Sequence, residues 1–286
     1  MILIADGGST KADWILLDKA GKQVLKTRTE GLNPAVCEAA LLQTRIAENP
    51  ELATCKEKVT ELYFYGAGCG TEKPAAALKA IFEAYFSQAS VTVKEDTYAA
   101  TYAVTNEPGM VCILGTGSNS CFFDGETVDV RIPSLGYILM DEASGNYFGK
   151  KLLRDYYYQK MPASLAAQFA AEFDLEPDSI KRALYKEENP NTYLSHFAEF
   201  ILKNDRNAYF NKVLHKGMKD FFKNKVLTYQ ESQEYPVHFV GSIAYFAKDI
   251  IEDVARYHMV SLGNIVRRPI DGLLQYHAKK LALEQV

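Results

Sequence analysis

Phosphate-binding chemistry is first suggested by the stretch DGGSTKAD, residues 6–13. Its glycines permit a positive φ, so the backbone N–H groups of a tight turn can converge on an anion. Thr10 adds a hydroxyl group and Lys11 a positive charge, and both suit a phosphate. The predicted phosphate contacts are Gly7, Gly8, Ser9, Thr10 and Lys11. A plain hairpin with a glycine turn is the alternative interpretation, and it is the commoner one for such a stretch.

A second stretch, GTGSNS at residues 115–120, carries the same chemistry without the charge. Its predicted phosphate contacts are Gly115, Thr116, Gly117 and Ser118. A second hairpin turn is again the alternative interpretation. The pair is more informative than either stretch alone, because two facing turns can hold a polyphosphate from both sides. Neither stretch matches GxxxxGKS/T, so we exclude that class of nucleotide-binding enzyme.

Acidic residues at three places are candidates for catalysis or ligand binding. Asp6 ends an expected strand and suits a hydrated Mg²⁺, which binds through few carboxylates and many waters. Asp96 also follows an expected strand, where its carboxylate can act as general base for a hydroxyl nucleophile. A helix N-cap is an equally good role for an aspartate at that position. Asp141 and Glu142 can bind sugar hydroxyls or Mg²⁺, or can lie at a helix start without any ligand.

Two further glycine-containing stretches follow expected strands. In FVGSIAYF (239–246), Gly241 lets a flat ring lie against the backbone, and Ser242 begins a helix whose N-terminus favours an anion. An ordinary strand–helix joint is the alternative, and the stretch by itself favours that alternative. The glycines of YGAGCGT (65–71) do not form GxGxxG, because position 71 is Thr. They indicate either close backbone packing beside a ligand or a simple strand-to-helix turn.

The first 105 residues predict an alternation of strands and helices around these motifs. Three strands joined by tight turns come first, because apolar runs are separated by glycine-rich joints. A helix over 31–49 is expected next, with Asn33 as its cap and Pro34 at its first position. The expected strands are 1–5, 12–18, 22–29, 60–68 and 90–95, and the other expected helices are 72–86 and 97–105.

The second half repeats this opening. A hairpin block is expected over 110–131, a mostly helical region over 150–230, and a strand over 235–241. A helix from Ser242 to about Arg256 and a closing helix over 268–285 complete the chain. Each half therefore begins with a strand, a glycine-rich turn and two more strands. This layout is expected of two domains of one ancestral type, which face each other across a cleft.

Composition narrows the classes of function. The 286 residues favour two domains, which we place at 1–109 plus 270–286 and at 110–269. A formal net charge of −4, with no Lys/Arg cluster longer than two residues, argues against a nucleic-acid partner. No export signal or run of roughly 18 apolar residues is present, so we expect a cytoplasmic protein without a membrane partner. Five cysteines without CxxC spacing indicate reduced thiols, and the five scattered histidines do not predict structural zinc.

Taken in order, the motifs resemble those of the acetate and sugar kinase/actin superfamily. Within it the chain is similar to the BadF/BadG/BcrA/BcrD-type ATPases, and more closely to their N-acetylglucosamine kinase branch. DGGSTKADW matches the first phosphate motif, ILGTGSNS the second and FVGSIAYF the adenosine motif. The resemblance covers nearly the whole chain. It implies an α/β fold with two ribonuclease H-like, actin-like ATPase domains facing a central cleft.

The resemblance also implies a role for each motif in a kinase that uses ATP and Mg²⁺. Asp6 would lie near Mg²⁺, and the two turns would hold the β- and γ-phosphates from opposite sides. Gly241 and Ser242 would approach the adenosine, and Asp96 would take the proton from the 6-hydroxyl of the sugar. The implied sugar contacts are Asn33, Gly68, Asn119, Asp141 and Glu142.

The expected function is therefore phosphorylation of an amino sugar at its 6-hydroxyl, with N-acetylglucosamine as the leading substrate and N-acetylmuramic acid and glucosamine as alternatives. A homodimer is one candidate assembly, because dimers are common in the resembled family, but the sequence does not give the oligomeric state. TYAA after Asp96 is bulkier than the branch's usual run, and Trp14 is the single tryptophan, so the identity of the sugar stays open. One alternative is an ATPase activator of a 2-hydroxyacyl-CoA dehydratase. Its iron–sulfur cysteines would have to bridge two subunits, whereas Cys112 and Cys121 flank the phosphate hairpin. A non-catalytic nucleotide-dependent regulator is the other alternative.

Overall fold

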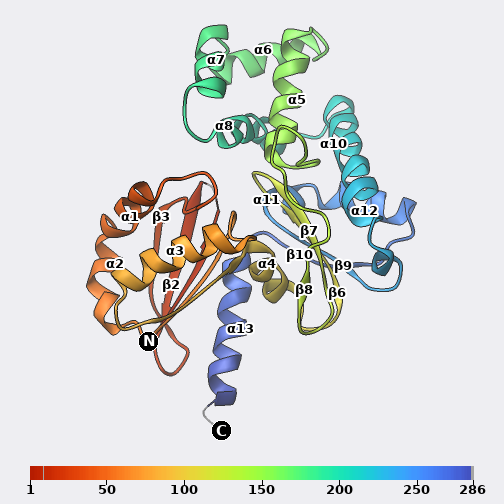
Figure 1. The fold of residues 1–286 in the computed structure, drawn as a ribbon. Coiled ribbons are helices and arrows are strands. Elements are labelled where there is room, and N and C mark those ends of the chain that lie inside the picture. The colour runs from red at the N-terminus through yellow and green to blue at the C-terminus, as the bar shows by residue number, and fades with distance from the viewer. Residues whose placement is uncertain (9, 285–286) are drawn as a thin grey trace. The chain divides into compact units, whose positions relative to one another are not determined.

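The chain folds into two compact units (Figure 1). In the computed structural model, which describes residues 1–8 and 10–284, Met1–Ala103 and Arg268–Val286 form the first unit. Val104–Arg267 form the second. Each unit is built on its own five-stranded mixed sheet with helices packed against it, so the predicted α/β class is confirmed. Among the described residues, every helix is too short or too polar to span a bilayer.

The first sheet has the order β3-β2-β1-β4-β5. Its strands are β1 (Ile2–Gly7), β2 (Lys11–Leu17), β3 (Gln23–Glu30), β4 (Glu61–Gly66) and β5 (Ser90–Glu95). The three hairpin-connected strands are antiparallel, whereas β4 and β5 run parallel to β1. All five strands expected in this part of the sequence are confirmed. Because β1, β4 and β5 are parallel, their carboxyl ends lie at one edge of the sheet.

Alternation along β1 gives this sheet two apolar faces. On one face, Leu3 and Ala5 belong to a core with Trp14. The segments on this side of the sheet are α1 (Ala39–Ala47), α2 (Pro50–Cys55), a short 3₁₀ turn (Lys56–Lys58) and α3 (Glu72–Tyr85). Ile2 and Ile4 face α4 (Asp96–Val104) and α13 (Pro269–Glu284). Figure 1 shows α1 and α3 along this sheet and α13 as the long blue helix. The sheet is thus covered on both sides, and only its strand ends are available for ligands.

The helix expected over 31–49 is shorter than predicted. Residues 31–38 form a loop, and α1 begins at Ala39. Asn33 does cap a turn, because its Oδ1 accepts the N–H of Ala35 (2.9 Å) and its carbonyl accepts the N–H of Cys37 (3.0 Å). The turn does not continue as a helix. The Asn33 side chain packs against Gly68, and this tertiary contact holds the loop in place.

The second sheet has the order β10-β9-β6-β7-β8. Its strands are β6 (Gly109–Leu114), β7 (Ser118–Phe123), β8 (Val128–Asp129), β9 (Val237–Val240) and β10 (Leu262–Val266). Three antiparallel strands are again followed by two strands parallel to the first. Both units therefore have the same strand order, which explains why the sequence repeats its opening pattern.

The sequence did not predict β10, the strand that completes this repeat. Gly263 and Asn264 interrupt its apolar pattern, and both are poor strand formers. A Cβ at position 263 would clash with the His238 ring, and Asn264 donates its N–H to His238 Nδ1 (2.9 Å). The register with β9 also shifts between Leu262 and Ile265. Gly263 and Asn264 therefore fit this strand because of their contacts with His238 on β9, and not because of their own strand propensity.

The helical region expected over 150–230 is confirmed. It contains α5 (Gly145–Tyr157), α6 (Ala163–Glu172), α7 (Pro177–Tyr185), α8 (Pro190–Phe197), α9 (Glu199–Lys203), α10 (Ala208–Phe221), a π-helix (Phe222–Val226) and a 3₁₀ turn (Gln230–Gln233). The single helix expected from Ser242 to Arg256 is instead two helices that meet at Ala247. These are α11 (Ser242–Phe246) and α12 (Lys248–Tyr257).

A close crossing of α5 and α8 holds the start of α5. A Cβ at Gly149 would overlap the carbonyl oxygen of Leu194, and one at Gly145 would overlap the Oγ of Ser195. The obstacle at Gly149 is backbone, which cannot rotate away as a side-chain end can. Glycine at position 149 therefore lets the two helices approach closely, and this fixes the segment before α5.

We expect Gly149→Ala to destabilise the protein by about 3 kcal/mol, near the upper end for overpacking. For a unit of this size that corresponds to a fall in Tm of roughly 6–12 °C by thermal unfolding. Gly115→Ala is the matched control, because an added Cβ there meets nothing within 4 Å, and its Tm should stay at the wild-type value. Equal Tm values for both variants would show that α5 and α8 can separate at no cost.

Candidate functional site

The carboxyl ends of β1, β4 and β5 form an aligned edge in the first unit. Gly7 pairs with Gly66, and Gly66 pairs with Glu95, so the three strands end in one row. Ligands of open sheets with parallel strands bind outside such ends. Asp6 lies in the row just before this edge, and Asp96 follows β5 directly. The edge thus gathers two of the predicted functional carboxylates.

Asp6 lies in a cross-strand row of charges. It pairs in register with Asp13, and Asp13 pairs with Arg28. Arg28 binds the buried Asp13 carboxylate through Nε (2.7 Å) and Nη2 (2.6 Å). The pKa of Asp6 is raised to about 7, mainly by burial and also by the Asp13 charge, whereas the Lys11 charge acts to lower it. Without a ligand, the negative charge on Asp6 is therefore unfavourable in the folded protein.

The turn after β1 differs from the sequence prediction in its glycines. Neither Gly7 nor Gly8 has a positive φ. Gly7 is required because the ring of Phe64 lies where its Cβ would be, and the Gly8 N–H donates to the Lys11 carbonyl (2.8 Å). Thr10 and Lys11 are exposed beside the turn, as a ligand contact needs. Ser9, also predicted to bind phosphate, lies outside the described residues.

The loop after β4 meets the predicted sugar-binding residues of the first unit. Gly68 has φ +79°, and a Cβ there would overlap the Oδ1 of Asn33. Two residues later, a Cβ on Gly70 would crowd the carboxylate of Glu95. This part of the edge therefore brings Asn33, Gly68 and Glu95 close to a single short loop.

Asp96 is the first residue of α4 and is half-buried. Cys69 lies in the adjacent loop, and the charges of Asp96 and Glu95 affect its thiol. The pKa of the Cys69 thiol is raised to about 12, mainly by burial and in smaller part by the carboxylates of Asp96 and Glu95. The thiol therefore stays protonated at neutral pH and is a poor nucleophile.

In the second unit, the turn 115–118 is held by the first residues of α5. The N–H groups of Gly145 and Asn146 donate to the carbonyls of Gly115 (2.8 Å) and Thr116 (3.0 Å). The turn's carbonyls therefore point toward α5. The space beside Gly115 is open, so a ligand can approach the backbone there.

Asp141 braces this turn. Its Oδ1 accepts the Ser118 N–H (3.1 Å) and its Oδ2 accepts Nδ2 of Asn146 (2.8 Å), while the residue is 5% exposed. Asp141 has φ +73° and Ala143 has φ +57°, so the segment between turn and helix is strained. Strain of this kind persists only where surrounding contacts enforce it, and it clusters at functional sites. Asp141 therefore orients the second predicted phosphate turn.

The remaining predicted contacts of the second unit are Gly241, Ser242, Asn119 and Glu142. Gly241 has φ +123°, and a Cβ there would overlap the carbonyl oxygen of Leu114, so only glycine fits. Ser242 is exposed and begins α11. Asn119 is 6% exposed, and its Oδ1 accepts the Ser120 N–H (2.9 Å). Oε1 of Glu142 accepts Nδ2 of Asn224 (3.1 Å), whereas its buried Oε2 has no hydrogen-bond partner among the described residues.

Sequence reasoning missed the residues that support these groups, namely Asp13, Arg28 and Asn146. Asp13 had a readable signal, because a carboxylate inside the apolar run ADWILL is unusual on a buried strand. Arg28 and Asn146 had none, since each is recognised only through the carboxylate that it contacts. Asn146 contacts the predicted residue Asp141, Asp13 pairs with the predicted residue Lys11 (3.7 Å), and Arg28 holds Asp13.

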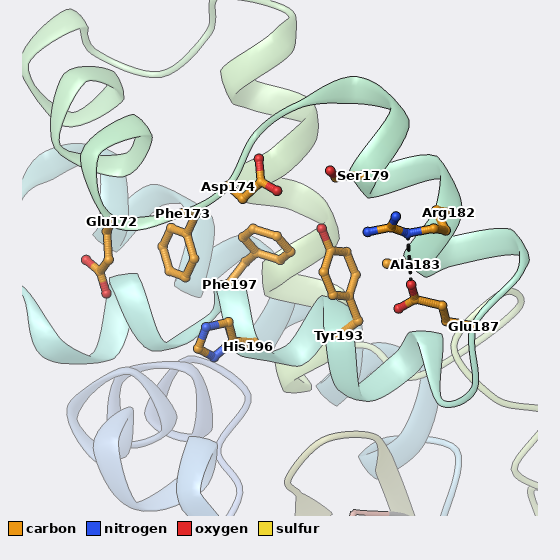
Figure 2. Close-up of a pocket in the computed structure, with 10 residues that line it drawn as sticks. All are labelled: Glu172, Phe173, Asp174, Ser179, Arg182, Ala183, Glu187, Tyr193, His196 and Phe197. Carbon is orange, nitrogen blue, oxygen red and sulfur yellow. Dashed lines mark hydrogen bonds and ion pairs between the residues drawn. The ribbon is translucent and has the colours of Figure 1, made fainter.

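A separate pocket of about 290 Å³ lies among α6, α7 and α8 (Figure 2). Its lining includes Arg182, Tyr193 and His196, and Arg182 pairs with Glu187 (3.0 Å). Figure 2 shows the rings of Phe173 and Phe197 next to each other among the lining side chains. None of the predicted functional residues lines it, and Arg182 and His196 are largely exposed. We therefore assign the chemistry to the strand ends.

The comparisons with known proteins bear on the fold and the family of the chain. No family model and no curated protein matches the chain, so the narrower BadF/BadG/BcrA/BcrD resemblance stays a prediction. The structure of a candidate N-acetylglucosamine kinase from Chromobacterium violaceum is similar, with a TM-score of 0.74 at 15% sequence identity. The match covers 96% of this chain and 98% of that one. A ROK family glucokinase from Streptomyces griseus, solved with glucose and AMPPNP, has TM-score 0.60 at 15% identity and covers 96% and 97%. These two show the fold.

A third structure shows the family. The candidate N-acetylglucosamine kinase from Porphyromonas gingivalis is 32% identical, with TM-score 0.91 over 98% of this chain and 99% of its own. The chain therefore belongs to the same family as the Porphyromonas protein, a family of sugar kinases with the two-domain actin-like ATPase fold.

Proposed function

We propose that this protein transfers the γ-phosphoryl group of ATP to the 6-hydroxyl of an amino sugar, most favourably N-acetylglucosamine. The observation that carries the proposal is the common edge of β1, β4 and β5, which gathers Asp6 and Asp96. The relative from Porphyromonas supports N-acetylglucosamine as the acceptor, and the glucokinase with AMPPNP supports ATP as the donor.

In this mechanism the sugar O6 attacks the γ-phosphorus while the bond from that phosphorus to the β–γ bridging oxygen breaks. Asp96 accepts the proton of the hydroxyl, and ADP leaves. The transition state is loose, so the protein contributes mainly by positioning and by stabilising charge. In the first unit, Thr10 and Lys11 bind phosphate. In the second unit, the turn 115–118 does so, and the open space at Gly115 admits a phosphate to the backbone.

The residues present fit a magnesium ion at Asp6. Among the described residues no group of three or more His, Cys, Asp or Glu forms a metal cage, and Mg²⁺ does not need one because it keeps several waters. The raised pKa of Asp6 marks a carboxylate whose charge lacks compensation, and a bound cation would supply it. When bound with ATP, Mg²⁺ would neutralise phosphate charge. Asp6 would hold the ion, whereas the Asp13 carboxylate is already bound by Arg28.

The dehydratase-activator alternative is less well supported. Its iron–sulfur cluster needs cysteines that can bridge two subunits, yet Cys112 and Cys121 are 0% exposed within the second sheet. Burial raises the pKa of Cys112 well above its ordinary value, which disfavours the thiolate that metals bind.

ADP release with Mg·ATP should be measured against N-acetylglucosamine, N-acetylmuramic acid, glucosamine, N-acetylmannosamine, glucose and a control without sugar. We expect stimulation by an amino sugar, with N-acetylglucosamine the strongest. ADP release that is independent of every sugar would favour an ATPase or regulator instead. Nucleotide binding without any turnover would contradict the kinase proposal for this panel.

Asp96→Asn should lower kcat roughly 10²- to 10⁴-fold, because the amide cannot accept the hydroxyl proton. The affinity for ADP, measured by calorimetry, should stay near the wild-type value. Asp271→Asn is the matched control, since Asp271 is an exposed acid in the first turn of α13 in the same unit. Loss of ADP affinity together with kcat would assign Asp96 a structural role.

Asp6→Asn should stabilise the protein without metal while it impairs Mg·ATP use. Because the folded-state pKa is about 7 against an ordinary 3.8, the wild type loses stability as pH rises from about 4 to about 7, and the loss is constant above that. The variant should lack this loss and gain about 1–2 kcal/mol at pH 8, allowing for the partial exposure of Asp6. Chemical denaturation in EDTA from pH 5 to 8 measures it. Parallel pH profiles for variant and wild type would remove Asp6 from this role.

A further inference from the structure

Lys225 is a buried cation in the second unit. It is 2% exposed, although lysine is almost never fully buried unless it is paired. It lies in the π-helix Phe222–Val226, and such segments are rare and frequently found at functional sites. Its backbone carbonyl accepts the hydroxyl of Ser120 on β7 (3.2 Å), which anchors the segment against the second sheet.

The ammonium group of Lys225 approaches the segment that braces the second turn. Its Nζ lies 3.9 Å from the Sδ of Met140, which is a weak acceptor. Met140 directly precedes Asp141 and Glu142. Burial lowers the pKa of Lys225, and the charges of Glu142 and Asp141 act in the opposite direction. The ammonium group therefore interacts electrostatically with both carboxylates, although it forms no ion pair within 4 Å with either.

Glu142 has the complementary deficiency. Asn224, the residue before Lys225, donates to its Oε1, but its Oε2 is buried without a hydrogen-bond partner among the described residues. A carboxylate oxygen that is buried without a hydrogen bond is unfavourable, and a nearby buried cation offsets part of that cost. The π-helix therefore serves the segment twice, through the amide of Asn224 and through the charge of Lys225.

We propose that Lys225 is a positioning residue for phosphoryl transfer, which holds residues 140–146 in place and, through Asp141, the turn 115–118. The proposal rests on the proposed function, because it takes that turn as the phosphate contact. Lys225 acts on the nucleotide only through Asp141, whose carboxylate orients the Ser118 N–H. Removing its charge leaves Asp141 and Glu142 as two adjacent carboxylates without a cation, and the strained segment then relaxes away from the turn.

The test compares Lys225→Met with Lys223→Met, Glu142→Gln and the double variant K225M/E142Q. Lys223 lies in the same π-helix but is exposed, so it controls for the loss of a positive charge as such. Calorimetry with Mg·ADP gives affinity, thermal unfolding gives Tm, and the ADP-release assay gives kcat and KM.

We expect Lys225→Met to weaken Mg·ADP affinity roughly tenfold and to raise KM for ATP similarly. The double variant should recover most of this loss, because it again has balanced charge, and K223M should match the wild type. A Lys225→Met protein with lower Tm but wild-type affinity and KM would reduce Lys225 to a structural residue and overturn the proposal. Losses that simply add in the double variant would overturn it as well.

If Lys225→Met does not fold, the double variant is expected to fold and to bind Mg·ADP, and a double variant that folds no better contradicts the coupling. A wild type that binds Mg·ADP but turns over no sugar sinks the proposed function alone. Affinity and Tm then still decide the role of Lys225. A wild type that binds no nucleotide overturns both proposals.

Discussion

The packing of one phenylalanine ring against two glycines is the contact on which the strand ends of the first unit depend. Phe64 lies where both Gly7 and Gly66 would carry a Cβ, and these glycines are register partners on β1 and β4. Any larger residue would push the ring out and separate the strand ends. Because the ends stay together, Asp6 and Asp96 occupy one edge of one sheet.

Carboxylates at this edge and at its counterpart in the second unit are kept in place by different means. Asp13 is compensated by an arginine, and Asp141 by a backbone N–H and an amide. Asp6 and Glu142 are less well compensated, as the raised pKa of one and the orphaned oxygen of the other indicate. Groups that bind a ligand cannot be fully satisfied beforehand, so a functional site retains some unfavourable charge in the free protein.

The two units share a strand order but divide the chemistry. In the first, the strand ends carry the carboxylates proposed for magnesium binding and proton transfer. In the second, the corresponding ends carry a turn without charge, braced by Asp141, and a glycine at position 241 that approaches the backbone of β6. A repeated fold therefore supplies two sets of strand ends, and loop composition decides what each set binds.

The sequence by itself determined the strands of both hairpins, the two glycine-rich turns and the place of Asp96 at a strand end. Local alternation and turn composition are enough for these features, because each depends on neighbours in the chain. Other features depend on the tertiary structure alone. These are the need for glycine at position 7, the start of α1, the formation of β10 by residues 262–266, and the residues that support the site. The physical reason is that these features depend on contacts between residues that are separated in the sequence, and a local pattern does not contain such contacts. The residues that make them are Phe64, Gly68, His238, Arg28 and Lys225.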